Sequence, residues 1–178
     1  VRGTHGVEVA DKEAVRRIAK WLSENVRNLW TAGMQDFGTS GGLQYLSSIG
    51  GLPTRNFQEG SFEGAEKITG STMADTILTA NDTCYACPVR CKRKVEVKER
   101  FPVTPEYGGP EYETIGAFGS ACGIDDLEAI AYANQLCNAY GLDTISTGMT
   151  IAWAMECFER GLLMPEDTGG LNLRFGDA

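Results

Sequence analysis

The sequence is poor in several of the residues and patterns on which common enzyme classes depend. It has one histidine, His5, in an N-terminal turn where we expect no metal role, and it shows neither a Ser/His/Asp arrangement nor a phosphate-binding glycine loop. No internal repeat and no low-complexity tract occurs. No apolar run approaches the roughly 18 residues of a membrane-spanning helix, and there is no signal-peptide layout. We therefore expect a cytoplasmic protein that does not enter a membrane.

Positive charge is also scarce. The 178 residues carry a formal net charge of −8 at pH 7, and the sequence pI is about 4.7. This balance argues against nucleic acid or an anionic membrane surface as a main partner. Hydrophobic residues make up 42% and charged residues 22%, as in a globular protein long enough to bury a real core.

Cysteine, by contrast, is plentiful but unevenly spaced. Six cysteines in a short chain would suit a disulfide framework, yet several lie on apolar helical faces, which fits a reducing compartment better. Both ends look cut, because the chain begins at Val1 without a methionine and stops in a turn-like segment at Ala178. We expect a fragment of a longer polypeptide.

Three thiols lie within eight residues, in the pattern Cys84-x-x-Cys87-x-x-x-Cys91. Such spacing brings several sulfurs within reach of one metal centre, so an iron–sulfur or other metal site is the favoured interpretation. Pro88 would stiffen the loop. The alternatives are a structural zinc site, or a disulfide plus one free thiol. A fourth ligand must come from outside the chain or from the remaining cysteines, Cys122, Cys137 and Cys157.

The hydrophobic pattern predicts a mainly α fold: a multi-helical domain with a cysteine-rich loop and at most one short strand pair. Apolar positions recur at helical spacing from residue 11 to residue 30, so one face of that helix should be buried. A helix starting near Thr72 should deliver the chain to the cysteine loop. The alternation from Lys92 to Lys98 suggests a short strand, whose bases either screen a negative cluster or form a solvated face.

Two further stretches carry candidate site residues. A Pro/Gly-rich loop over residues 102–110 leads into a helix whose first turn holds Glu111 and Glu113; either is explained by the helix dipole, and either could transfer a proton. The stretch Asp125-Asp126-Leu127-Glu128 has the form of a capping box and should open the next helix. Gly141 should end that helix, and Asp143 should cap its successor. Residues 138–143 therefore form a helix–turn–helix corner.

Together these segments resemble the tungsten-containing aldehyde ferredoxin oxidoreductase family. The resemblance is carried by the cysteine motif, by Gly-Gly-Pro-Glu-Tyr-Glu-Thr over residues 108–114, by Cys122-Gly123, and by Asn-x-x-Gly-Leu-Asp-Thr-Ile-Ser over residues 138–146. It covers essentially the whole chain and implies that residues 1–10 are the tail of a preceding pterin-binding β domain. Residues 11–178 would then be a helical domain truncated at its C-terminus.

The resemblance also assigns roles to particular residues. It implies that Cys84, Cys87 and Cys91 are three ligands of a 4Fe-4S cluster, with the fourth lying beyond residue 178. The pterin-binding motif would correspond to Asn138, Gly141, Leu142 and Asp143, with Asn138 standing where the family has an aspartate, so that no charge is supplied there. Glu113 matches the glutamate near the tungsten, a proton-transfer group. The family's active-site histidine and second pterin motif are absent from this sequence.

The parent protein is thereby expected to use a tungsten bis-pterin (tungstopterin) centre to oxidise a small-molecule aldehyde to a carboxylic acid. Its cluster would pass the electrons to ferredoxin, and the parent could form homo-oligomers. The isolated chain is expected to be inactive and could hold no cofactor. Two alternatives remain open: a zinc-clipped structural module, and a cofactor-free helical domain with a mobile cysteine loop.

Overall fold

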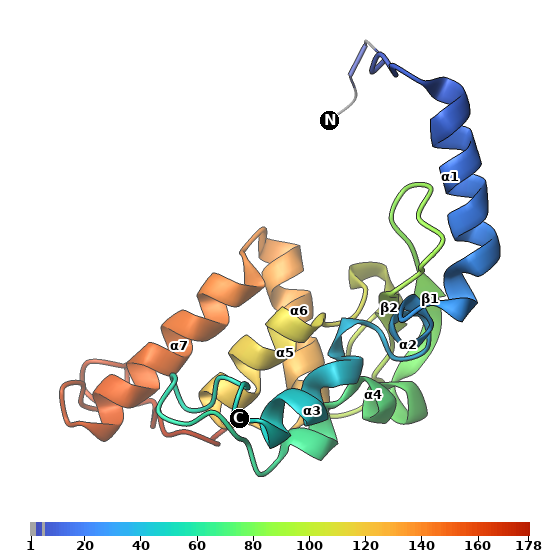
Figure 1. Ribbon diagram of the computed structural model, residues 1–178. Helices are drawn as coiled ribbons and strands as arrows, with labels where there is room; N and C mark the ends of the chain where they lie inside the picture. The colour runs from blue at the N-terminus through green and yellow to red at the C-terminus, as the bar shows by residue number, and fades with distance from the viewer. Residues whose placement is uncertain (1–2, 5) are drawn as a thin grey trace.

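The computed structural model describes residues 3–4 and 6–178, and over these residues the chain is mainly helical, as predicted (Figure 1). The expectation for His5 thus lies outside the described residues, and so does part of the expectation for the 1–10 tail. The described residues form seven α-helices and one two-stranded sheet. In chain order the elements are α1 Lys12–Asn25, α2 Thr31–Phe37, α3 Leu43–Ser48, α4 Gly70–Thr76, β1 Leu78–Asp82, β2 Lys92–Val95, α5 Tyr112–Phe118, α6 Leu127–Tyr140 and α7 Thr144–Glu159.

The two strands form an antiparallel hairpin that carries the cysteine loop at its tip. Asp82, the last residue of β1, lies opposite Lys92, the first of β2, and residues 83–91 connect them. The loop projects beyond the strands (Figure 1). The prediction that the loop hangs from a helix end is therefore wrong. Helix α4 ends at Thr76, and strand β1 follows it. The sequence did not predict this strand because it is short and mostly polar.

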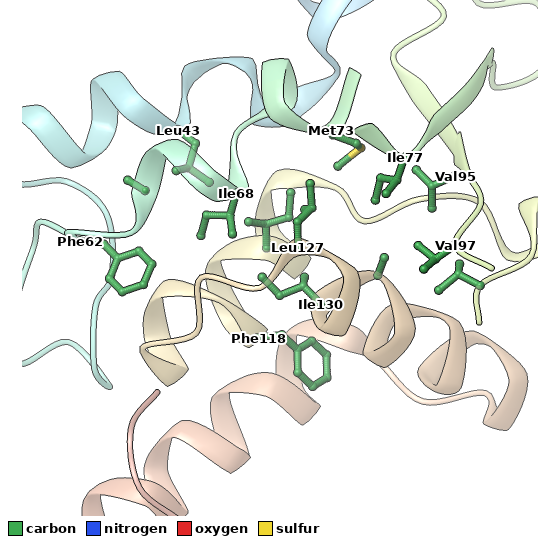
Figure 2. Packing of buried hydrophobic residues seen from close by; sticks show 14 of the residues in the cluster. Leu43, Phe62, Ile68, Met73, Ile77, Val95, Val97, Phe118, Leu127 and Ile130 are labelled. Atoms are coloured by element: carbon green, nitrogen blue, oxygen red, sulfur yellow. The ribbon is translucent and has the colours of Figure 1, made fainter. Parts of the chain in front are cut away.

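The main core lies between the N-terminal helices, the hairpin and α5–α6. Figure 2 shows Leu43 from α3, Ile68 and Met73 from the α4 region, Val95 from β2 and Ile130 from α6 gathered in one cluster. All five side chains are at most 1% exposed. A smaller cluster joins Ala121 and Cys122 to α7. The core thus fixes the hairpin against α5 and α6, the elements that carry the other predicted site residues.

The first helix departs from expectation in two ways. Helix α1 stops at Asn25, and a 3₁₀ turn over Val26–Asn28 separates it from α2. Here the chain turns inward: Val26 is buried and its carbonyl accepts a 2.7 Å hydrogen bond from the Thr31 hydroxyl. The apolar face of α1 is also not buried, since Val15, Ile18 and Trp21 are each more than half exposed. Periodicity identifies an amphipathic face but does not say what covers it.

The helix boundaries around the corner at residues 138–143 are confirmed. The predicted capping box at residues 125–128 does open α6, and its second aspartate, Asp126, is the cap: it accepts from the backbone N–H groups of Glu128 and Ala129, each at 3.1 Å. Gly141 ends α6 in the left-handed conformation, with φ 70°.

No helix among the described residues is long and apolar enough to cross a membrane.

Candidate cofactor site

The cysteine loop makes two sharp turns, each just before a cysteine. Ala86 and Arg90 directly precede Cys87 and Cys91, and both take left-handed backbone conformations, with φ of 54° and 58°. These conformations are unfavourable for residues with a side chain and occur where the surrounding structure requires them. The Cys87 N–H also bonds to the Cys84 carbonyl at 3.1 Å. The loop backbone thus turns sharply just before Cys87 and again just before Cys91.

All six thiols are free, and the three in the loop are all at least partly accessible. Cys84 is exposed, and Cys87 and Cys91 are half-buried. In the part of the chain that the structure describes, no group of three or more His, Cys, Asp or Glu side chains is arranged to hold a metal ion. Three closely spaced thiolate donors nevertheless have the chemistry that an iron–sulfur cluster requires.

The remaining cysteines do not reach the loop. Cys122 and Cys137 are buried in the two hydrophobic clusters, and the thiol of Cys122 donates to the Ala117 carbonyl at 3.3 Å. Burial raises the pKa of the Cys122 thiol to about 12, which keeps it protonated. Cys157 lies on α7, half-buried, and belongs to no potential metal group among the described residues. A zinc site with a local fourth cysteine is therefore not supported by this arrangement.

A polar cavity of about 350 Å³ lies between the hairpin and the α6–α7 corner. Its volume is within the range of small-molecule and cofactor sites. One side is formed by Lys92 and Lys94 of β2, and the other by polar side chains from α5, α6 and α7. The latter include Thr114, Asn134, Asn138 and Thr144. The cavity thus joins the exit of the cysteine loop to the predicted pterin motif.

The two candidate glutamates have different surroundings. Glu111 is the N-terminal cap residue of α5; it lines the cavity, and its carboxylate accepts a 2.6 Å bond from the Thr39 hydroxyl. Burial, together with the negative charge of Glu111, raises the pKa of the Cys91 thiol, which places this carboxylate near the loop. Glu113 is exposed in the first turn of α5 and does not line the cavity. Its assigned proton-transfer role remains a prediction.

The predicted pterin motif forms the turn between α6 and α7. Asn138 lines the cavity and donates to the Asn134 carbonyl at 2.8 Å. Gly141 provides the left-handed turn, and Leu142 is 54% exposed. Asp143 caps α7 by accepting from the Ser146 N–H at 2.6 Å, and this bond lowers the pKa of its carboxyl. The motif is thus exposed, with Asn138 at the cavity edge.

One residue of the site was missed by sequence reasoning. Arg93 was treated as part of a charged run, but its side chain is only 3% exposed. The signal was present, because residues alternate between faces of a strand and Arg93 shares its face with Val95 and Val97. Both of these valines are buried.

A thiol loop beside a polar cavity in a helical domain is the arrangement expected of a cofactor-binding redox domain. The family model described as aldehyde ferredoxin oxidoreductase, domains 2 and 3, matches residues 13–178, and the chain belongs to this family. The resemblance noted from the sequence is thereby confirmed.

Named relatives support the same family assignment. The chain is 42% identical, over 99% of its length, to a tungsten-containing aldehyde ferredoxin oxidoreductase of Pyrococcus horikoshii. It is 40% identical, over 95% of its length, to the protein of the same name from Thermococcus kodakarensis. An aliphatic sulfonate oxidoreductase, WOR-like subunit, of Pyrococcus furiosus is 30% identical over 96% of the chain. The chain spans only 29%, 28% and 27% of these three proteins, respectively.

Proposed function

We propose that this chain is the cluster- and pterin-binding helical part of a tungsten enzyme that oxidises an aldehyde to a carboxylic acid. The observation that carries the proposal is the position of one polar cavity between the hairpin that carries the cysteine loop and the α6–α7 corner. A pterin held at Asn138 would lie on the same cavity as the strand that leaves the cluster loop. Such proximity suits electron transfer between the two groups.

The residues present have a chemistry that fits both groups. Cys84, Cys87 and Cys91 would supply thiolates to a 4Fe-4S cluster, with a fourth ligand from the rest of the parent. Asn138, Gly141, Leu142 and Asp143 would hold a pterin through amide, backbone and carboxylate groups. When bound, the tungsten bis-pterin supplies two-electron oxidation and the cluster supplies single-electron transfer to ferredoxin. Glu113 would accept and release a proton as water adds to the aldehyde carbon.

The proposal extends to the setting of the parent protein. Residues 1–10 would be the end of a preceding pterin-binding domain, and residues 11–178 would form the helical domain. Free thiols at all six cysteines are consistent with a reducing cytoplasm. The isolated chain would be inactive, since it lacks the second pterin motif.

The test is metal analysis of the full-length parent, purified without oxygen, with single serine substitutions. The wild type is expected to hold tungsten, acid-labile sulfide and about four irons per chain. Cys84→Ser, Cys87→Ser and Cys91→Ser should each lose most of the iron and sulfide. Cys157→Ser is the matched control, because Cys157 is a half-buried thiol outside the loop, and it should retain both.

The same measurement can overturn the proposal. One zinc per chain with no sulfide would make the loop a structural clip and exclude the redox role. Full iron content in all three loop variants would remove these cysteines as ligands. Aldehyde oxidation with ferredoxin as acceptor, measured on the wild-type parent, tests the reaction itself.

A further inference from the structure

Arg93 lies in the second strand, two residues after the last cysteine of the loop, and its guanidinium is fully engaged by backbone. Its Nε donates to the Cys91 carbonyl at 2.9 Å, and a terminal nitrogen donates to the Arg90 carbonyl at 3.1 Å. The terminal nitrogens also donate to three carbonyls at the end of α2, those of Met34, Gln35 and Asp36, at 3.2, 2.9 and 3.1 Å. One side chain thus connects the cysteine loop to a helix about 57 residues earlier in the chain.

Glycines next to Arg93 leave the space that its side chain occupies. A Cβ atom on Gly38, the cap residue of α2, would lie 3.0 Å from Arg93 Nε and 3.3 Å from the Cys91 carbonyl oxygen. A Cβ on Gly109 would lie 2.9 Å from Arg93 Cβ. Both distances are closer than ordinary contact. Two glycines from different loops therefore flank the buried arginine.

The contacts explain why arginine rather than lysine is suited to this position. A guanidinium presents five N–H donors in a rigid planar fork, whereas an ammonium is a compact group on a flexible stem. Here the donors are directed to five carbonyls on two separate segments. The Arg90 carbonyl is one of them, and Arg90 is a residue in the left-handed conformation. Arg93 thereby stabilises the strained turn that precedes Cys91.

The charge of Arg93 is also unusual in its setting. No carboxylate among the described residues lies within ion-pair distance of it, although other arginines of the chain form such pairs. Burial lowers the pKa of the guanidinium from its ordinary value, but an arginine stays protonated in a protein. A buried charge without an ionic partner is costly. The three carbonyls at the negative end of α2 offset part of that cost.

We propose that Arg93 is a positioning residue for the metal centre: it locks the Cys91 ligand and the turn before it onto α2, and holds a permanent positive charge beside the cluster. This inference rests on the proposed function. Residues that orient a metal ligand typically change metal affinity about 10- to 100-fold when substituted. The reduction potential of a cluster responds to nearby charge and hydrogen bonding.

The experiment compares Arg93→Lys and Arg93→Met in the anaerobically purified full-length parent. Both variants should lose iron to a chelator about tenfold or more faster than the wild type, because both lack the fork. The midpoint potential of the cluster should fall in Arg93→Met, which removes the charge, and should move less in Arg93→Lys, which keeps it. A role in folding alone would not separate the two variants in this way.

Two further variants serve as controls. Arg27→Lys replaces an exposed arginine that pairs with the side chain of Asp36 on α2, the helix that Arg93 also contacts. This variant should match the wild type. Gly38→Ala keeps the charge but pushes against Nε, so it should also speed iron loss, and it provides the comparison if Arg93→Lys fails to fold. Circular dichroism of each variant reports folding.

The outcomes distinguish a failure of the proposed function from a failure of the role of Arg93. If the wild-type parent holds no iron and sulfide, the proposed function fails and this inference fails with it. If the wild type holds a cluster, and both Arg93 variants release iron at the wild-type rate with an unchanged potential, only the role of Arg93 is overturned.

Discussion

At the scale of single residues, two glutamates that are two positions apart at the start of α5 are placed in different surroundings. Glu111 is tied to Thr39 and lies near Cys91, whereas Glu113 is exposed on the first turn of α5. We expect Glu113→Gln in the full-length parent to lower kcat for aldehyde oxidation by about 100-fold or more, since it would remove the proposed proton-transfer group. Tungsten and iron content should not change.

Glu111→Gln is the matched comparison, as it makes the same chemical change two residues away. It should affect the stability of the iron site more than turnover, because Glu111 borders the cysteine loop. The reverse result, with turnover lost in Glu111→Gln and retained in Glu113→Gln, would transfer the proton role to Glu111. Steady-state kinetics together with metal analysis of both variants decides between them.

At the scale of elements, the turn between α6 and α7 has a structural role beside its predicted cofactor role. The lowered pKa of Asp143 means that its cap of α7 stabilises the fold above its ordinary pKa of 3.8 and loses that contribution as the pH falls through the lower folded value. Asn caps helices about as well as Asp but does not titrate. We therefore expect Asp143→Asn to match the wild type in urea unfolding at pH 7 and to lose less stability below pH 3.8.

The control for this pH dependence is Asp143→Ala, which removes the cap at every pH. It should be less stable than both other proteins at pH 7. An identical pH dependence in wild type and Asp143→Asn would show that the Asp143 carboxylate does not contribute to the acid transition. Urea midpoints at a series of pH values provide the measurement.

The ends of α6 and α7 that meet at residues 138–143 were the most predictable features, because their signals are local. Gly141 and Asp143 each act through a bond to a residue within four positions, so the sequence was sufficient to locate them. At the start of α6 the sequence located the capping box but did not say that Asp126 is the cap. The hairpin was missed because β1 is short and polar, and the burial of Arg93 was missed although it alternates with the buried Val95 and Val97. The partners of Arg93 depend on a distant segment. Arg93 reaches carbonyls 57 to 59 residues away, and no local pattern encodes such partners.

At the scale of the whole molecule, the core lies away from α1, although α1 is more strongly amphipathic than the other two long helices, α6 and α7. Figure 1 shows α1 extending from the body, and Figure 2 shows the core on the other elements. Ile68 is fully buried, whereas Ile18 on α1 is 62% exposed. The two isoleucines therefore allow the same substitution to be made in two different environments.

Ile68→Ala in this chain should lower the free energy of unfolding by about 2–5 kcal/mol, because it removes buried methyl groups and leaves a cavity. Ile18→Ala should change it by no more than about 0.5 kcal/mol, since an exposed side chain has little burial to lose. Urea unfolding followed by circular dichroism measures both. A comparable loss in Ile18→Ala would mean that α1 is packed against other parts of the chain in solution, and that the core extends over its apolar face.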